Sequence, residues 1–252
     1  MSTVLVTGAG RGIGKAITAH MATRGWDVVA GVRRQEDAAV VGALPRVTPV
    51  MLDVTNDEQV ASLDDLLPAR LDAVVNNAGI AVGGPLEAVG TADLRRQFDV
   101  NVVGQMAVTR AVLPRLRESR GRIVFMSSVS GRISTPMTGA YCASKFALEA
   151  AADALRMELK PWHISVSVVE PAQTDTDMWA TADQMVEDIE GAMTAEQRVL
   201  YAKHIAGMKK VIPMSQRMAV PTENVAEVVA QALTSRRPRA RYPVGIGPTV
   251  QL

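Results

Sequence analysis

The sequence predicts an α/β fold, a doubly wound parallel sheet with helices on both faces. Over the first 170 residues, short apolar segments rich in β-branched residues alternate with helix-length segments. The short segments are almost continuously apolar, which is typical of strands covered on both faces. No Gly/Ser-rich linker or internal repeat divides the 252 residues. We therefore expect one domain over residues 1–252, with right-handed crossovers between strands.

Seven strands are expected, because each of these segments is apolar, short and followed by a turn: Thr3–Thr7, Asp27–Gly31, Thr48–Met51, Ala73–Asn76, Arg122–Ser127, Ser165–Val169 and Arg241–Val244. The principal helices are expected, from their length and apolar periodicity, at Gly14–Arg24, Thr91–Glu118, Ala140–Leu159, Ala182–Lys210 and Glu223–Leu233. A loop is expected around Pro213, between the last two of these helices.

Composition argues against several classes of protein. Lys and Arg number 27 and Asp and Glu 26, without a long block of like charge, which disfavours a nucleic-acid or membrane-surface binder. The single cysteine, Cys142, forms no intrachain disulfide, and the three histidines are scattered, so we predict no metal site. No targeting segment or membrane-spanning run is recognisable, so the expected location is the cytoplasm.

A glycine-rich turn follows the first expected strand. Gly8, Gly12 and Gly14 stand between that strand and the next helix, in the sequence Thr-Gly-Ala-Gly-Arg-Gly-Ile-Gly. Glycines in this setting permit a tight turn and close approach of the backbone to a pyrophosphate, which the helix N-terminus then binds. The alternative is a purely structural glycine turn. The spacing differs from the common G-x-G-x-x-G, because Ile13 falls where the last glycine would be.

The end of the second strand bears on the choice between NADP and NAD. A NAD site normally has an acid there for the ribose hydroxyls, whereas this chain has Arg33. Arg33 and Arg11, in the glycine turn, would bind a 2′-phosphate, so we favour NADP over NAD. The alternative is that both arginines only face solvent. Asp53, after the third strand, is expected either at the adenine edge or as the cap of the next helix.

Tyr141 and Lys145 are the candidate acid/base pair. Four residues apart in an expected helix, they share one helix face, where an ammonium stabilises a phenolate. Ser128 follows the fifth strand, and the segment Asn76–Gly79 ends the fourth. The carboxyl ends of parallel strands meet at one edge of a sheet, so we expect these residues to converge there.

Taken together, these motifs resemble the short-chain dehydrogenase/reductase family, whose members have the Rossmann fold, over nearly the whole chain. The resemblance rests on TGxxxGxG at Thr7–Gly14, NNAG at Asn76–Gly79, Asn101, Ser128 and Tyr141-x-x-x-Lys145. It implies an NAD(P)-dependent oxidoreductase that transfers a hydride between a nicotinamide and a carbonyl or secondary alcohol.

The resemblance also implies roles for individual residues. Tyr141 is the general acid/base, and Ser128, rather than its neighbour Ser127, holds the substrate oxygen. Lys145 binds the nicotinamide ribose and tunes Tyr141, and Asn101 helps to hold a water for proton relay. The expected cofactor-binding residues are Gly8, Arg11, Gly12, Ile13, Gly14, Arg33, Asp53, Val54, Asn77, Ala78, Gly79, Tyr141, Lys145, Pro171, Thr174 and Thr176.

One motif departs from the family pattern. The family usually has Pro-Gly after the sixth strand, where this chain has Pro171-Ala172, which puts the local geometry in doubt. Thr176 falls where the family's nicotinamide-binding threonine lies. The segment of about 177–218 corresponds to the substrate-binding region or lid; its apolar residues are expected either to cover a lipophilic substrate or to pack between helices or subunits: Met178, Trp179, Met185, Met193 and Met208.

Other functions remain as alternatives. A catalytically silent nucleotide-binding regulator or scaffold would keep the fold, but such a protein is expected to lack Tyr141, Lys145 or Ser128. A dehydratase or epimerase acting on a nucleotide-linked sugar is generally longer than this chain. The helix Thr91–Glu118 resembles the family's subunit-contact helix, so a homodimer or homotetramer is expected. Cys142 is expected to be a small packed residue.

Overall fold

The computed structural model describes residues 1–175 and 182–245 and contains a seven-stranded, all-parallel sheet with the strand order β3-β2-β1-β4-β5-β6-β7. The strands are β1 (Thr3–Thr7), β2 (Asp27–Val32), β3 (Val47–Met51), β4 (Ala73–Asn76), β5 (Arg122–Met126), β6 (Ser165–Pro171) and β7 (Arg241–Val244). The predicted doubly wound α/β fold is confirmed. The strand order reverses between β1 and β4, which is where such folds bind ligands.

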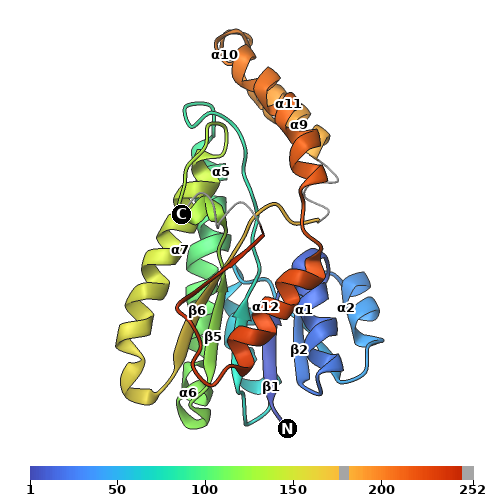
Figure 1. The fold of residues 1–252 in the computed structure, drawn as a ribbon, viewed down its shortest axis with the longest axis vertical. Coiled ribbons are helices and arrows are strands. Elements are labelled where there is room, and N and C mark those ends of the chain that lie inside the picture. Colours follow the sequence, from blue (N-terminus) through green and yellow to red (C-terminus); the bar gives the residue numbers. More distant parts are fainter. Residues whose placement is uncertain (176–181, 246–252) are drawn as a thin grey trace.

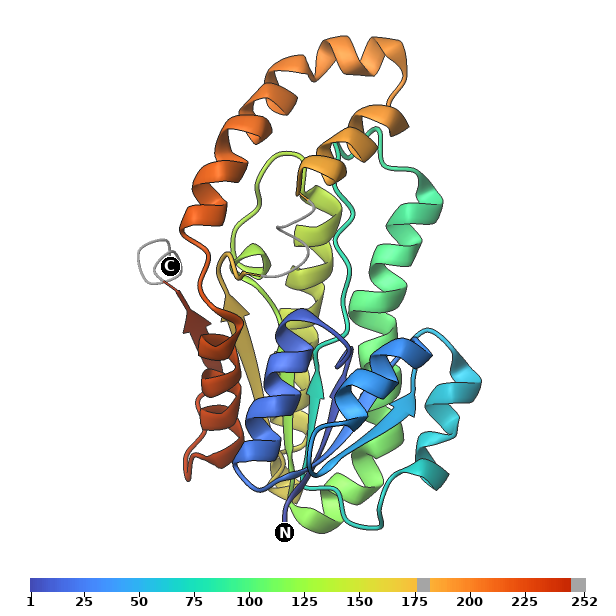
Figure 2. The same ribbon diagram turned by 90° about the vertical axis from the view of Figure 1, so that its right-hand side faces the viewer.

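Helices cover both faces of the sheet, as the two ribbon views show (Figures 1 and 2). One face packs on α1 (Gly12–Thr23), α2 (Gln35–Gly42) and α12 (Thr222–Thr234). The other packs on α3 (Asp57–Ala61), α4 (Leu63–Leu66), α6 (Gly104–Ser119) and α7 (Gly139–Glu158). Because β1, β4 and β5 are buried on both sides, the central residues of each are apolar without alternation.

The predicted helix Thr91–Glu118 is continuous but changes its winding. It consists of α5 (Thr91–Phe98), a π-helical segment (Asp99–Val103) and α6. Such single-turn π segments are frequent at functional sites. This one contains Asn101, whose buried side chain binds the backbone of Ile80.

The prediction of one helix over Ala182–Lys210 is wrong. The segment forms α9 (Ala182–Ala192), α10 (Ala195–Leu200) and α11 (Ala202–Arg217). Thr194 begins α10 with a capping box, in which its hydroxyl accepts from the Gln197 N–H and the Gln197 side chain accepts from the Thr194 N–H. These bonds satisfy N–H groups that a new helix start leaves free, so they favour a break here.

The predicted loop around Pro213 is also wrong, because Pro213 lies inside α11. Ile212 and Ser215, on either side of it, are buried, whereas Pro213 is exposed. The buried face of α11 therefore continues through the proline. A proline in a helix removes one backbone hydrogen bond, and here packing outweighs that loss.

Helices α9, α10 and α11 form an arm that extends beyond the carboxyl ends of the strands (Figures 1 and 2). Its inner side is an apolar cluster built on six buried residues: Met137, Val186, Ile189, Met193, Ile205 and Ile212. Three of the predicted substrate-cover residues are found here: Met193 belongs to the cluster, and Met185 and Met208 pack against it. Met178 and Trp179 lie outside the described residues. We refer to α9–α11 as the arm.

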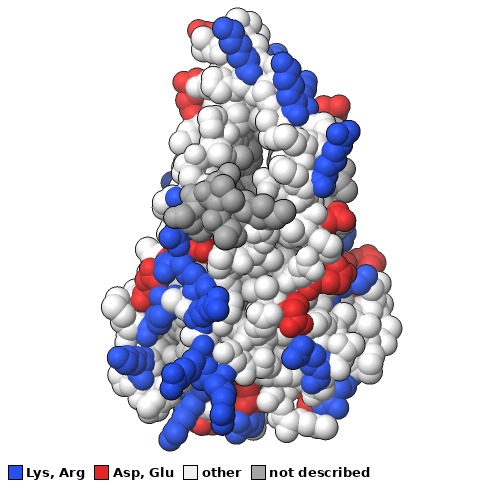
Figure 3. Space-filling model, viewed as in Figure 1, with Lys and Arg blue, Asp and Glu red and all other residues white. Residues whose placement is uncertain are grey.

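Charges of both signs are interspersed over the face seen in Figure 3. The largest group of Lys and Arg side chains lies over the lower end of α7 and the turn between α12 and β7, which contains Arg236, Arg237 and Arg239. This group is at the opposite end of the sheet from the arm. In the described part of the chain, none of the helices is both long and apolar enough to cross a membrane.

Candidate active site

The glycine turn has the geometry that a nucleotide site requires. Gly8 and Gly12 adopt φ values of 64° and 50°, in the left-handed region that favours glycine. A Cβ on Gly14 would lie 2.1 Å from the Gly8 carbonyl oxygen, so only glycine fits there. Helix α1 begins at Gly12 and has no acidic residue in its first turn. Its first N–H groups are therefore available to an anion.

The turn is held by residues from the end of β4. The Asn77 side chain donates to the carbonyls of Thr7 (2.9 Å) and Gly8 (3.2 Å). In return, the Thr7 hydroxyl accepts from the N–H groups of Asn77 and Ala78, each at 3.0 Å. The two predicted motifs thus bind each other across the point where the strand order reverses.

Arg11 and Arg33 are both exposed near this turn, and neither forms an ion pair with a described residue. The adjacent Arg34 instead pairs with Asp37 (3.0 Å). The Asp37 side chain lies against Gly10, where a Cβ would come within 2.6 Å of its Cγ. An acid thus lies beside the turn, although none stands at the end of β2, and the sequence analysis did not identify it.

Asp53 does not cap a helix. Its Oδ1 accepts from the N–H (2.9 Å) and the hydroxyl (2.7 Å) of Thr55, whereas Asn56 caps α3. The capping alternative for Asp53 is therefore wrong, because the helix cap is Asn56, three residues further along the chain. Val54, next to Asp53, is buried, and its carbonyl lies against Gly104 at the start of α6.

Tyr141 and Lys145 lie in the first two turns of α7, on one face as predicted. The Lys145 Nζ lies 5.6 Å from the centroid of the Tyr141 ring and donates to the Met126 carbonyl at the end of β5 (2.7 Å). Lys145 is buried, and Tyr141 is partly buried. The end of β5 therefore fixes the ammonium beside the phenol.

Burial shifts the proton affinity of both groups. It raises the pKa of Tyr141 to about 12, while a hydrogen bond with Ser128 acts in the opposite direction. It lowers the pKa of Lys145 to about 8, opposed by the negative charge of Glu149. At neutral pH the phenol is protonated and the lysine mostly charged. The pair can therefore donate a proton from the Tyr141 hydroxyl.

The structure separates the two candidate serines. Ser128 precedes the short 3₁₀ turn Val129–Gly131, and its hydroxyl lies close enough to the Tyr141 phenol to lower the pKa of that group. Its hydroxyl also accepts from the Ser130 N–H (3.1 Å). The Ser127 hydroxyl is buried against Gly131 and has no hydrogen-bond partner among the described residues. The geometry favours Ser128 as the partner of Tyr141.

Asn101 connects the π-helical segment to the site. Its Oδ1 accepts from the Ile80 N–H (2.9 Å), and its Nδ2 donates to the Ile80 carbonyl (3.0 Å) and to Ser144 (3.1 Å). Gly79 lies between Asn101 and Lys145: a Cβ on it would be 3.4 Å from the Asn101 Oδ1 and 3.8 Å from the Lys145 Nζ. Asn101 thus fixes the segment after β4 beside Lys145.

The Pro171-Ala172 departure is accommodated by a neighbouring glycine. Gly245 lies just beyond β7 and has a φ of 101°, in the region that favours glycine. A Cβ at this position would lie only 3.0 Å from the Ala172 methyl carbon, so the absence of a side chain on Gly245 leaves room for that methyl group. The Thr174 hydroxyl donates to the Ala172 carbonyl (3.1 Å), and Thr174 is buried. Thr176 lies outside the described residues.

Several buried polar residues support the site although the sequence analysis did not single them out. The Gln97 amide binds the Ile80 carbonyl (2.9 Å) and the Val82 N–H (2.7 Å). Gln105 donates to the Ala78 carbonyl (2.8 Å). Glutamines are common on solvent-facing helices, so nothing in a single sequence marks these two as buried.

The fold and this arrangement define a nucleotide-binding α/β protein with a partly buried Tyr–Lys–Ser site at the carboxyl ends of its strands. Comparison with known proteins then gives the family: residues 2–187 match the short chain dehydrogenase model. The chain belongs to the short-chain dehydrogenase/reductase family and is an NAD(P)-dependent oxidoreductase.

Named relatives span almost the whole chain. It is 34% identical to a 3-amino-tetrahydro-pyrrolizinone reductase of Xenorhabdus hominickii, covering 96% of this chain and 86% of the relative. It is 31% identical to a 3-ketodihydrosphingosine reductase of Bacteroides thetaiotaomicron, covering 99% and 89%. Retinol dehydrogenase 16 of Mus musculus is 32% identical, covering 96% and 80%.

Solved structures of similar proteins contain either cofactor. A short chain dehydrogenase from Burkholderia cenocepacia in complex with NADP aligns with a TM-score of 0.77 and 27% identity, covering 99% of this chain and 90% of that one. A short chain dehydrogenase/reductase from Burkholderia phymatum in complex with NAD aligns with a TM-score of 0.79 and 25% identity, covering 95% and 88%.

Proposed function

We propose that this enzyme transfers a hydride between NADP and a carbonyl or secondary alcohol, with Tyr141 as its general acid/base. The observation that carries the proposal is the position of the Tyr141 phenol, beside the Ser128 hydroxyl and the Lys145 ammonium at the carboxyl edge of the sheet. A group that gives a proton to a carbonyl oxygen must lie within hydrogen-bond reach of it. Ser128 and Tyr141 together offer two hydroxyls to that oxygen.

Each site residue has a part in the proposed reduction. Ser128 and Tyr141 hold the carbonyl oxygen, and the Tyr141 hydroxyl donates its proton there as the carbonyl carbon is reduced. The bound dinucleotide supplies the hydride. Lys145 holds the nicotinamide ribose and, as a cation, stabilises the phenolate left on Tyr141. Asn101 helps to hold the water that returns a proton to the pair.

The residues of the glycine turn fit a dinucleotide. The first turn of α1 has free N–H groups and no acidic side chain, so it can bind a phosphate. Gly14 has no room for a side chain, so the backbone stays open to the dinucleotide. The proposed binding set is the predicted one, from the turn, the strand ends and α7: Gly8, Arg11, Gly12, Ile13, Gly14, Arg33, Asp53, Val54, Asn77, Ala78, Gly79, Tyr141, Lys145, Pro171, Thr174 and Thr176.

Arg33→Ala is expected to weaken NADPH binding about tenfold or more while leaving NADH binding almost unchanged. Arg11 and Arg33 are exposed beside the turn, and hydrogen bonds to a charged group contribute about 1.5–3 kcal/mol. Fluorescence titration with each cofactor gives both dissociation constants. Arg236→Ala, an exposed arginine at the other end of the molecule, is the control for net charge. Equal weakening of both cofactors by Arg33→Ala would contradict the 2′-phosphate assignment.

We propose a lipophilic substrate. A pocket between the loop before α7 and the arm is lined mainly by apolar residues, among them Leu86, Pro136 and Met137, with Tyr201 contributed by the arm. Two of the relatives are named for hydrophobic substrates, 3-ketodihydrosphingosine and retinol. Large apolar sites with few polar groups are typical of such ligands.

Two measurements test the proposed function. The protein is first titrated with NADPH and NADH, and turnover of a panel of lipophilic ketones is then followed by nicotinamide absorbance. Tight NADPH binding with oxidation by a panel member supports the proposal. Binding of neither cofactor would overturn it. If the cofactor binds but no ketone is turned over, the panel is widened to alcohols with NADP. Absence of turnover there too would favour the catalytically silent regulator.

We also propose a homo-oligomer, formed through α6 and α7. Three large apolar side chains are exposed here. Val103, at the end of the π-helical segment just before α6, is 55% exposed, and Phe146 and Met157 on α7 are 43% and 71% exposed. Exposed apolar patches on a helix face often mark subunit contacts. Sedimentation equilibrium is expected to give a dimer or tetramer, and a monomer at micromolar concentration would contradict the proposal.

A further inference from the structure

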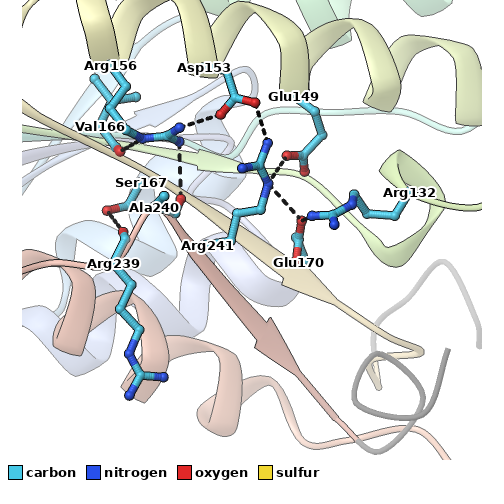
Figure 4. A network of polar contacts seen from close by, with 10 residues as sticks. All are labelled: Arg132, Glu149, Asp153, Arg156, Val166, Ser167, Glu170, Arg239, Ala240 and Arg241. Atoms are coloured by element: carbon cyan, nitrogen blue, oxygen red, sulfur yellow. Dashed lines mark hydrogen bonds and ion pairs between the residues drawn. The ribbon is translucent and has the colours of Figure 1, made fainter. Parts of the chain in front are cut away.

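A network of buried and half-buried charges lies behind the catalytic helix, between α7, β6 and β7 (Figure 4). Glu149 and Glu170 are 5% and 1% exposed. Arg241 joins them: its Nε lies 3.0 Å from Glu149 and 3.5 Å from Glu170, and its Nη2 lies 2.6 Å from Asp153. Arg132, from the loop after Ser128, pairs with Glu170 (3.1 Å).

The network reaches the catalytic site through one helical turn. Glu149 follows Lys145 by four residues in α7, so the two side chains lie on the same helix face. Both are buried, yet Lys145 donates to the Met126 carbonyl, and Glu149 forms its ion pair with Arg241 instead. The second carboxylate oxygen of Glu149, Oε1, is buried without a partner among the described residues.

A buried lysine is costly to keep charged, because burial removes the water that stabilises an ammonium. Lys145 donates one hydrogen bond, to a backbone carbonyl, and forms no direct ion pair with a described residue. The side chains of Tyr141 and Asn101 lie near Lys145, and both are uncharged at neutral pH. Their neighbours Ser128, beside Tyr141, and Ser144, bonded to Asn101, are uncharged as well. Glu149 is therefore the negative charge nearest to it along α7.

We infer that Glu149 is a positioning residue for catalysis: its carboxylate, held in place by Arg241, keeps the buried Lys145 ammonium protonated. This inference rests on the proposed function, because it assigns Glu149 to the same Tyr141–Lys145 pair. Glu149 acts through its field rather than by contact with the reacting atoms. In agreement, the charge of Glu149 opposes the fall in the pKa of Lys145 that burial causes.

The charges of the network give the sign of each substitution. The network has three carboxylates and three guanidinium groups: Glu149, Asp153, Glu170, Arg132, Arg156 and Arg241. Glu149→Gln leaves an excess positive charge beside Lys145, so its ammonium is less stable. Arg241→Gln leaves an excess negative charge, so the ammonium is more stable. A role limited to packing would not give opposite signs.

The test is a titration of Lys145 in the protein without cofactor or substrate, so its outcome does not depend on turnover. The chain has six lysines, so ¹³C labelling at lysine Cε gives a simple NMR spectrum, in which Lys145→Arg identifies the Lys145 signal. The wild-type midpoint is expected near the pKa of about 8. Glu149→Gln is expected to lower it by about one pH unit, the shift for charges separated by one helical turn at intermediate dielectric.

Glu158→Gln is the matched control, since it makes the same chemical change at an exposed position at the end of α7 and is expected to leave the midpoint unchanged. Arg241→Gln is expected to raise the midpoint, and it also tests the inference if Glu149→Gln fails to fold. Equal midpoints in wild type and Glu149→Gln would overturn the inference. So would a downward shift in Arg241→Gln, or a shift in Glu158→Gln as large as in Glu149→Gln.

Discussion

Tyr141→Phe is expected to reduce turnover by about 10²–10⁴-fold while leaving NADPH binding almost unchanged. The substitution removes only the hydroxyl that the proposed reaction uses for proton transfer, a step that contributes about that factor. The ring remains in place beside the Lys145 ammonium, so the shape of the site is retained. Steady-state rates with the best ketone, together with NADPH titration, measure the two effects separately.

Tyr242→Phe is the matched control for the loss of a hydroxyl. The Tyr242 hydroxyl accepts from the Arg239 N–H (2.9 Å) in the segment before β7, so its removal is expected to lower the melting temperature slightly and to leave turnover unchanged. Retention of full turnover in Tyr141→Phe would show that another group transfers the proton.

Gly14→Ala is expected to abolish cofactor binding and to destabilise the fold by about 1–3 kcal/mol, the usual cost of adding a methyl group to a closely packed site. The new methyl would lie 2.1 Å from the Gly8 carbonyl oxygen and 2.5 Å from the Asn77 side chain. Both are parts of the bonded pair of motifs that shapes the turn. Denaturant unfolding and cofactor titration measure the two losses.

Gly207→Ala is the control for glycine replacement within a helix. Gly207 lies in α11, and a Cβ there meets no atom within 4 Å. Alanine is favoured over glycine inside helices by about 0.5–1 kcal/mol, so this variant is expected to be as stable as wild type or more so. If Gly14→Ala bound NADPH as wild type does, the glycine turn would not be the pyrophosphate site.

The sequence predicted the parts of this molecule whose causes are local. The strands followed from continuous apolar runs, and the position of Tyr141 beside Lys145 followed from helical spacing. The break before α10 also has a local cause, because Thr194-x-x-Gln197 is a capping-box pattern that marks the start of a helix. The prediction of a loop at Pro213 failed, because a proline alone does not reveal that Ile212 and Ser215 on either side of it are buried.

Other features depend on residues far apart in the chain. Glu149 and Arg241 are 92 residues apart, and Ala172 is accommodated by Gly245, 73 residues later. The contacts between Asn101 and Ile80 likewise require the fold before they can be foreseen. A single sequence shows neither which charged side chains are buried nor which partners they meet.

Transfer of deuterium tests the central claim most directly. NADPH carrying deuterium at the hydride-transferring position of its nicotinamide ring would be incubated with the enzyme and a ketone from the panel that it reduces. The proposed function predicts one deuterium at the carbinol carbon of the alcohol, measured by mass spectrometry, and almost no product with Tyr141→Phe. An alcohol formed without deuterium, or at the wild-type rate by Tyr141→Phe, would contradict it.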